Sequence, residues 1–378
     1  MKQQIAWTNR AAVPEAVDDL MKQLSETGEN CNLVMFFASV SYDFAELSRA
    51  LKEKFPKSEV VGCSTSGEIS ENGFTKNGIV LTTMSCSATK VKGVIIREGA
   101  KYPIIEKDEI LGAMRSCGIV PGQGGHDDCF AFTFINGLCN AEECILSLLY
   151  SLIEDDRFKI LGGSAGDDLK FDTTYASLNG EVVTDGGVVV FVKTSKRFTI
   201  VKENIFKPSG RKVNFTKVDT ASRRLIEIDN KPATAEYARQ LGIREDEIGG
   251  ASLMHPLGRM FGDNIFISSI AGVNNDKSFG MYCRVMPNTK VDIMELGDVE
   301  GIMNSTCDAI EAAIPRTGFV FFINCILRTL MFEKNTQGKY LVDLYKNRFG
   351  KVAGFSSYGE QIDKINSNQT LVVLAMEE

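Results

Sequence analysis

The sequence predicts a mixed α/β protein, α+β by strict criteria, in which two lobes of sheet and helix combine repeated βαβ modules with antiparallel meanders. Three observations predict this class. A glycine motif occurs three times, the same strand–helix–strand order precedes each copy, and short β-branched segments bounded by turn residues fill the intervals. A length of 378 residues exceeds that of a common single domain, so we expect two lobes.

Each copy of the glycine motif places a serine between two glycines and follows the last glycine with a carboxylate. Glycine lets backbone turn sharply or approach other groups closely, so we expect the motif glycines to form turns at strand ends. The chain has 34 glycines against 9 prolines, and the motifs account for part of that excess. The copies are GCSTSGE at 62–68, GGSAGD at 162–167 and GFSSYGE at 354–360.

A strand, an amphipathic helix and a short returning strand are predicted ahead of each motif. Such a βαβ unit builds parallel sheet and carries its functional loops at the carboxyl ends of its strands. A further helix is expected before each unit, at 13–24, 105–114 and 299–310. The predicted units are 33–38, 44–55 and 59–61; 129–135, 140–152 and 159–161; and 318–323, 328–348 and 351–353.

Extended segments between the units predict antiparallel hairpins, because turn signals such as Asn179-Gly180 separate them. The polar stretch 207–220 is the expected boundary between two domains, 1–210 and 211–378, and a short helix is expected at 233–241. The extended segments are 78–84, 91–97, 175–178, 187–192, 198–206, 265–271, 281–286, 291–296 and 369–374.

Composition excludes several classes of function. The net charge is −7 with both signs mixed along the chain, so no nucleic-acid partner is expected. No apolar stretch reaches the length of a membrane span, and the N-terminus lacks the apolar core of a signal peptide, so we expect a cytoplasmic protein with no membrane insertion and ten reduced cysteines. No metal site is expected, because there is no CxxC pair and His126 is predicted to lie at a solvated loop tip.

The three motifs in this order resemble the FIST family, and Pro256-Leu257-Gly258 and Cys325-Ile326-Leu327-Arg328 also fit it. The likeness covers 30–205 as a FIST N-like half and 222–362 as a FIST C-like half. It implies a sensory module, not an enzyme, that binds a small polar metabolite such as an amino acid. The implied output is a protein partner such as a kinase or a nucleotide cyclase.

Seven residues are the candidate ligand contacts. If the motif turns converge, a carboxylate can hold an ammonium group while the Arg328 guanidinium pairs with a carboxylate, which suits an amino acid. The alternative is that the serines and acids only cap turns and helix starts and that Arg328 is a solvated helix residue. The candidates are Ser64, Glu68, Ser164, Asp167, Arg328, Ser356 and Glu360.

Three other chemistries remain open. One subset of the FIST family binds haem and senses nitric oxide, and His255 is the candidate axial ligand for that alternative. The segment around Ser164 fits the GxSxG pattern of serine hydrolases, although that pattern needs a helix directly after it and a histidine base. Cys63 lies inside a motif, where turn N–H groups would lower the pKa of its thiol and favour redox chemistry.

Overall fold

The computed structural model describes residues 1–25, 31–262 and 264–378, and it confirms a mixed α/β fold. The chain forms two compact units. The first comprises 1–202, 304–366 and 371–378, and the second comprises 203–303 and 367–370. Within the described residues, none of the helices has the length and apolar character needed to cross a membrane.

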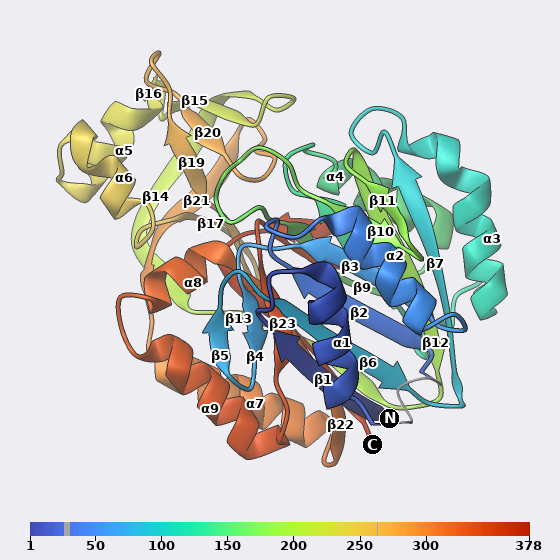
Figure 1. Ribbon diagram of the computed structural model, residues 1–378. Coiled ribbons are helices and arrows are strands. Elements are labelled where there is room, and N and C mark those ends of the chain that lie inside the picture. The colour runs from blue at the N-terminus through green and yellow to red at the C-terminus, as the bar shows by residue number, and fades with distance from the viewer. Residues whose placement is uncertain (26–30, 263) are drawn as a thin grey trace. The chain divides into compact units, whose positions relative to one another are not determined.

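The first unit consists of three modules that share one order of elements: entry strand, helix, first strand, crossover helix, returning strand, hairpin and closing strand (Figure 1). The three predicted βαβ units and the helix ahead of each are therefore confirmed. In the third module the second unit is inserted between the entry strand and its helix, and the crossover is split into two helices.

The elements of the first module are β1 (Lys2–Thr8), α1 (Val13–Gln23), β2 (Leu33–Ala38), α2 (Phe44–Lys54), β3 (Glu59–Ser64), β4 (Glu68–Ser70), β5 (Gly73–Thr75) and β6 (Ile79–Ser85). Those of the second are β7 (Thr89–Arg97), α3 (Lys107–Cys117), β8 (Cys129–Asn136), α4 (Glu142–Ile153), β9 (Lys159–Ala165), β10 (Ala176–Leu178), β11 (Glu181–Val183) and β12 (Gly186–Thr194). Those of the third are β13 (Phe198–Asn204), α7 (Val299–Ala313), β22 (Thr317–Cys325), α8 (Ile326–Phe332), α9 (Gln337–Phe349), β23 (Ala353–Ser357), β24 (Glu360–Ile362), β25 (Ile365–Ser367) and β26 (Thr370–Glu377).

Each module gives its hairpin to the sheet of another module. The strand orders are β1-β6-β2-β3-β10-β11, β7-β12-β8-β9-β24-β25 and β13-β26-β22-β23-β4-β5. The first hairpin therefore extends the third sheet, the second extends the first sheet, and the third extends the second sheet. The exchange is cyclic, and the glycine motif is the point at which the chain leaves one sheet and enters the next.

The inner faces of the three sheets share one apolar core, and phenylalanine rings from all three meet there. The Phe37 ring of β2 stacks on the Phe355 ring of β23, with centroids 4.5 Å apart and planes 5° from parallel, and it lies 5.6 Å from the Phe134 ring of β8. Helices α1 and α2 cover the outer face of the first sheet, and α3 and α4 cover that of the second (Figure 1).

The first glycine of each motif lies within a strand, so the expectation that it forms a turn is wrong. Gly62, Gly162 and Gly354 belong to β3, β9 and β23 and pack against the neighbouring first strand. A Cβ atom would lie 2.4 Å from the Phe36 ring at Gly62, 1.8 Å from Thr133 Oγ1 at Gly162 and 2.2 Å from the Phe322 carbonyl at Gly354. Close packing, and not a turn, requires glycine at these three positions.

The second unit is an antiparallel sheet with strand order β18-β17-β21-β14-β15-β20-β19, and β16 pairs with β15. The polar stretch 207–220, expected to separate domains, forms most of the long strand β14. The helix predicted at 233–241 is confirmed, whereas only Met281 of the strand expected at 281–286 is extended. The elements are β14 (Phe206–Asp219), β15 (Arg224–Ile228), β16 (Lys231–Pro232), α5 (Ala233–Leu241), α6 (Ile248–Ala251), β17 (Leu257–Phe261), β18 (Asn264–Ser268), β19 (Ile270–Val273), β20 (Phe279–Met281) and β21 (Thr289–Leu296).

Gly162→Ala is expected to lower the free energy of unfolding by about 3 kcal/mol, because the added methyl group overlaps Thr133 in a packed sheet. The matched control is Gly112→Ala in α3, where a Cβ meets nothing within 4 Å, so helix propensity raises stability by up to about 1 kcal/mol. Urea denaturation measures both, and equal stabilities of the two variants would contradict the close-packing role.

Candidate functional site

The seven residues predicted to contact a ligand all lie in the first unit, and each is at most 1% exposed. The serines lie near the ends of the three returning strands, and Glu68 and Glu360 are the first residues of β4 and β24. Asp167 follows β9, and Arg328 belongs to α8. His255 lies in the second unit and is half-buried, and its Nδ1 atom is 3.1 Å from the carbonyl oxygen of Met294.

The backbones of the three motif serines form a closed ring of hydrogen bonds with the turns of the neighbouring modules. Ser356 donates its N–H to the carbonyl of Gly67 and accepts from the N–H of Ser66, at 2.8 and 3.1 Å. Ser164 likewise donates its N–H to the carbonyl of Gly359 at 2.8 Å and accepts from the N–H of Tyr358 at 3.0 Å. Ser64 donates its N–H to the carbonyl of Tyr175 and accepts from the N–H of Gly166, both at 2.9 Å. The motif turns therefore converge, and each serine backbone joins two modules.

The serine hydroxyls are also bonded within the protein. Ser164 donates to Glu142 at the start of α4 at 2.8 Å, and Ser356 is 2.8 Å from the Thr329 hydroxyl in α8. Ser64 donates to the Gly166 carbonyl at 2.6 Å. These contacts attach the ring to crossover helices in the second and third modules.

Two of the motif carboxylates occupy equivalent positions with equivalent partners. Glu68 accepts from the Thr65 hydroxyl at 2.8 Å, and Glu360 accepts from the Ser357 hydroxyl at 2.7 Å. Glu68 also accepts from the N–H of Gly78 at 3.1 Å. Burial nevertheless dominates at Glu68 and raises the pKa of its carboxyl group to about 8, so the neutral acid is the main form at pH 7.

Asp167 differs because its carboxylate organises the loop that follows the second motif. It accepts from the N–H groups of Phe171, Asp172 and Thr173 at 3.0, 2.6 and 3.1 Å and from the Tyr358 hydroxyl. Within this loop Asp168, Leu169 and Phe171 have φ values of 55°, 63° and 54°, which L-residues seldom adopt. The carboxylate therefore stabilises a strained loop that contacts the first and third motifs.

Arg328 is fully buried, so the alternative of a solvated helix residue is wrong. Its Nε atom donates to Asn324 at 3.0 Å, and its guanidinium lies 5.2 Å from the centre of the Phe332 ring. A buried guanidinium needs several acceptors or an aromatic face, and α8 supplies Phe332 from the same helix.

The structure contradicts two further expectations and bears on a third. Cys63 lies in the apolar core, and burial raises the pKa of its thiol well above the usual value, which disfavours the reactive thiolate. His126 is 6% exposed and is not at a solvated tip. After Ser164 the described residues 166–175 form a loop, and not the helix that a nucleophile elbow needs.

A hollow of about 470 Å³, which we call the hairpin pocket, adjoins this network. It lies between the β4–β5 hairpin and helices α8 and α9, which run beside that hairpin in Figure 1. Thr329, which contacts Ser356, forms part of its floor. Sequence reasoning missed this pocket because its two walls come from different modules. Its lining residues are Glu71, Asn72, Gly73, Phe74, Thr329, Phe332, Glu333, Asn335, Gly338, Lys339, Val342 and Asp343.

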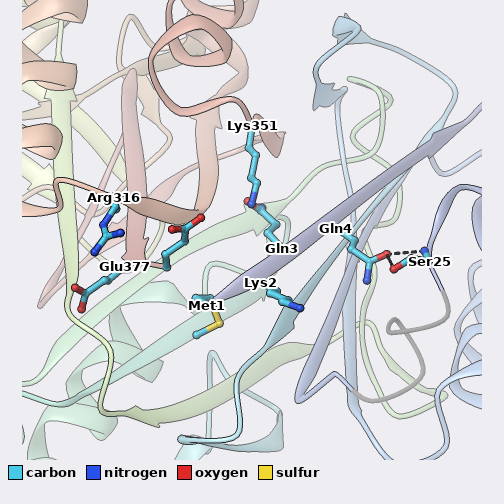
Figure 2. A pocket seen from close by; sticks show the side chains of 9 residues that line it. Met1, Lys2, Gln3, Gln4, Ser25, Arg316, Lys351 and Glu377 are labelled. Atoms are coloured by element: carbon cyan, nitrogen blue, oxygen red, sulfur yellow. Dashed lines mark hydrogen bonds between the residues drawn. The ribbon is translucent and has the colours of Figure 1, made fainter.

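Figure 2 shows a second, polar hollow of about 680 Å³ at the start of β1. Gln4 there accepts from the N–H and hydroxyl of Ser25 at 2.7 and 3.0 Å. This hollow includes none of the seven predicted residues. It is lined by Met1, Lys2, Gln3, Gln4, Ser25, Arg316, Lys351, Glu377 and Glu378.

Stability is expected to fall as the pH rises from about 5 to about 8. The folded state holds the Glu68 proton up to a pKa of about 8, whereas the unfolded state releases it near 4.5, so raising the pH favours unfolding by at most about 1.4 kcal/mol per pH unit. Glu68→Gln should flatten this part of the profile in urea denaturation at pH 5.5–8. A Glu109→Gln control on the exposed side of α3 should keep the wild-type slope, and an unchanged slope in Glu68→Gln would count against the buried neutral acid.

Two comparisons with known proteins give a distant relative and a weak structural overlap. An uncharacterized protein of Methanocaldococcus jannaschii is 23% identical over 401 aligned positions, which cover 92% of this chain and 73% of that protein. A crystal structure of cyanuric acid hydrolase from A. caulinodans overlaps 51% of this chain and 71% of its own at 9% identity, and its TM-score of 0.26 is too low to support any inference.

Family models match almost the whole chain. The FIST N domain matches residues 32–231 and the FIST C domain matches residues 233–363. The first match contains the motifs at 62–68 and 162–167, and the second contains the motif at 354–360 together with Arg328. FIST domains are sensory domains of signal-transduction proteins, and this chain belongs to the FIST family.

Proposed function

We propose that this protein is a sensor that binds a small cationic metabolite, such as a basic amino acid or an amine, in the hairpin pocket and signals through a protein partner. One observation carries the proposal. The place where a donated hairpin meets a crossover helix, which we call the joint, occurs in all three modules. Of the three joints, only that of the third module coincides with one of the two hollows described above.

Each of the other two joints has an aromatic contact. In the first sheet, Tyr175, directly ahead of the donated hairpin, stacks on Phe44 of α2, with ring centroids 5.4 Å apart. In the second, the ammonium group of Lys364, between β24 and β25, lies 5.0 Å from the centre of the Tyr150 ring of α4. A hollow lined by aromatic and charged side chains at one of these three comparable joints supports a binding role.

The lining of the hairpin pocket favours a cation with an apolar stem. Its floor is buried and largely apolar, and the half-buried Phe74 and buried Phe332 supply aromatic surface. Its exposed rim carries three carboxylates, Glu71, Glu333 and Asp343, against the single ammonium group of Lys339. Lys339 pairs with Asp343, and Lys76 pairs with Glu333 at 2.6 Å. Glu71 is therefore the acid best placed to receive a ligand ammonium or guanidinium group.

Helix α8 provides a physical connection from the pocket to the motif ring. Phe332 faces the pocket and also contacts the Arg328 guanidinium, while Thr329 lines the pocket and bonds the Ser356 hydroxyl. Occupancy of the pocket would therefore favour one arrangement of α8 and, through Ser356, one arrangement of the ring. A partner that binds only that arrangement reads the signal as a population shift.

Thermal unfolding in the presence of L-lysine, L-arginine and putrescine tests the binding step. At one hundred times the dissociation constant a ligand stabilises the protein by about 2.7 kcal/mol, a readily measured rise in melting temperature, whereas succinate should give none. Glu71→Gln should raise the ligand concentration needed for a given temperature shift about tenfold, since a charged hydrogen bond contributes about 1.5–3 kcal/mol. Asp108→Asn on α3 is the exposed control. No shift with any cation, or an equal shift in Glu71→Gln, would contradict this assignment.

Thr329→Val tests the connection, because it keeps the side-chain shape and removes the hydroxyl bonded to Ser356. We expect ligand affinity to change less than about threefold, as no charged contact is removed. In the wild type, ligand should slow hydrogen exchange at the amides of Ser66 and Ser356, and this slowing should be absent in Thr329→Val. Ring protection that persists in the variant would show that signal transfer bypasses this bond.

A further inference from the structure

We propose that His126, Asp128 and Cys129 form a binding site for a divalent transition metal of the zinc class. One ring nitrogen of His126, one carboxylate oxygen of Asp128 and the thiol sulfur of Cys129 all lie within 4.8 Å of one another. The three residues come from the end of the loop that follows α3 and from the first residue of β8.

The donor set has the chemistry of a zinc site. Imidazole nitrogen, carboxylate oxygen and thiolate sulfur are the protein ligands that this ion takes, at about 2.0–2.3 Å and in tetrahedral geometry. Ligand atoms around such an ion lie about 3.5 Å apart, so closure of the cluster needs shifts of about 1 Å. Calcium and magnesium prefer oxygen-only sets, so the thiol and imidazole select against them.

A second contact orients the histidine for this role. The Nε2 atom of His126 is 3.0 Å from the carbonyl oxygen of Val120. A carbonyl can only accept, so Nε2 carries the hydrogen and Nδ1 keeps the lone pair that a metal requires. Metal-binding histidines use this arrangement, in which the second nitrogen donates to a carbonyl or carboxylate. Asp155 further holds the loop by accepting from the N–H groups of Gly125 and His126 at 2.9 and 3.1 Å.

The donor set supplies two negative charges to a divalent ion. The Cys129 sulfur is 3.0 Å from Asp128 Oδ1, and the thiol hydrogen lies between them. The ion would replace this hydrogen, and one proton would be released to solvent. The carboxylate and the resulting thiolate supply two negative charges to the ion, while Lys193, 3.2 Å from the other Asp128 oxygen, leaves the group with one net positive charge.

Three protein ligands leave one tetrahedral position for water. The bound ion would fasten the loop after α3 to β8 and so stabilise the second module. None of the three residues lines the hairpin pocket, so this inference is independent of the proposed sensing function.

Titration of the chelator-treated, reduced full chain with Co²⁺ under anaerobic conditions tests the site. We expect one equivalent to bind with a thiolate-to-cobalt charge-transfer band and to be displaced by Zn²⁺. Cys129→Ser should abolish the band, and His126→Ala should weaken binding at least about tenfold. Cys117→Ser, at a buried thiol of α3 outside the cluster, should retain both the band and the affinity.

Circular dichroism establishes that each variant is folded. His126→Ala alters a loop residue and keeps the test decisive even if Cys129→Ser does not fold. A wild-type titration with no thiolate band would overturn the proposal. An unchanged affinity in His126→Ala, or a band that persists in Cys129→Ser, would assign the metal to other residues and would also overturn it.

Discussion

The cyclic exchange of hairpins is the constraint on which the first unit depends. Each returning strand ends at a motif where the chain must leave its own sheet, cross to another and pair there. No module can complete a six-stranded sheet alone, so the edge of each sheet is satisfied only by another module. The backbone ring of Ser64, Ser164 and Ser356 lies at these crossings. Its hydrogen bonds pair the backbone N–H and carbonyl groups that a change of sheet would otherwise leave unpaired.

This arrangement explains why so many polar residues are buried at the crossing. The side chains at the crossing are buried, so they depend on hydrogen-bond partners within the protein. Asp167 obtains four donors, three of them backbone N–H groups, which compensate for the loss of hydration. Glu68 has one hydroxyl and one N–H donor, and its carboxyl group responds by holding its proton at neutral pH.

Differences between the modules indicate where function resides. The third module carries the inserted second unit, a crossover divided into α8 and α9, and a fully buried arginine. It also has a hollow at its joint, whereas the equivalent joints of the other two modules each have an aromatic contact. Equivalent positions of the three modules that hold different residues offer an internal comparison, because packing alone would favour the same arrangement of side chains in each module.

The repeat, the strand–helix–strand order and the helix ahead of each unit were determined by the sequence, because hydrophobic periodicity and glycine placement are local properties. The same local signals misjudged Gly62, whose role depends on a ring in the adjacent strand. They also did not indicate that most of the polar stretch 207–220 forms a half-exposed strand. The backbones of the three candidate serines join the modules, but the partners and the burial of the seven candidate residues depend on which sheet each hairpin joins. That exchange, and with it the hairpin pocket, becomes visible only in the folded chain, because pairing between segments distant in the chain leaves no periodic signal in either one.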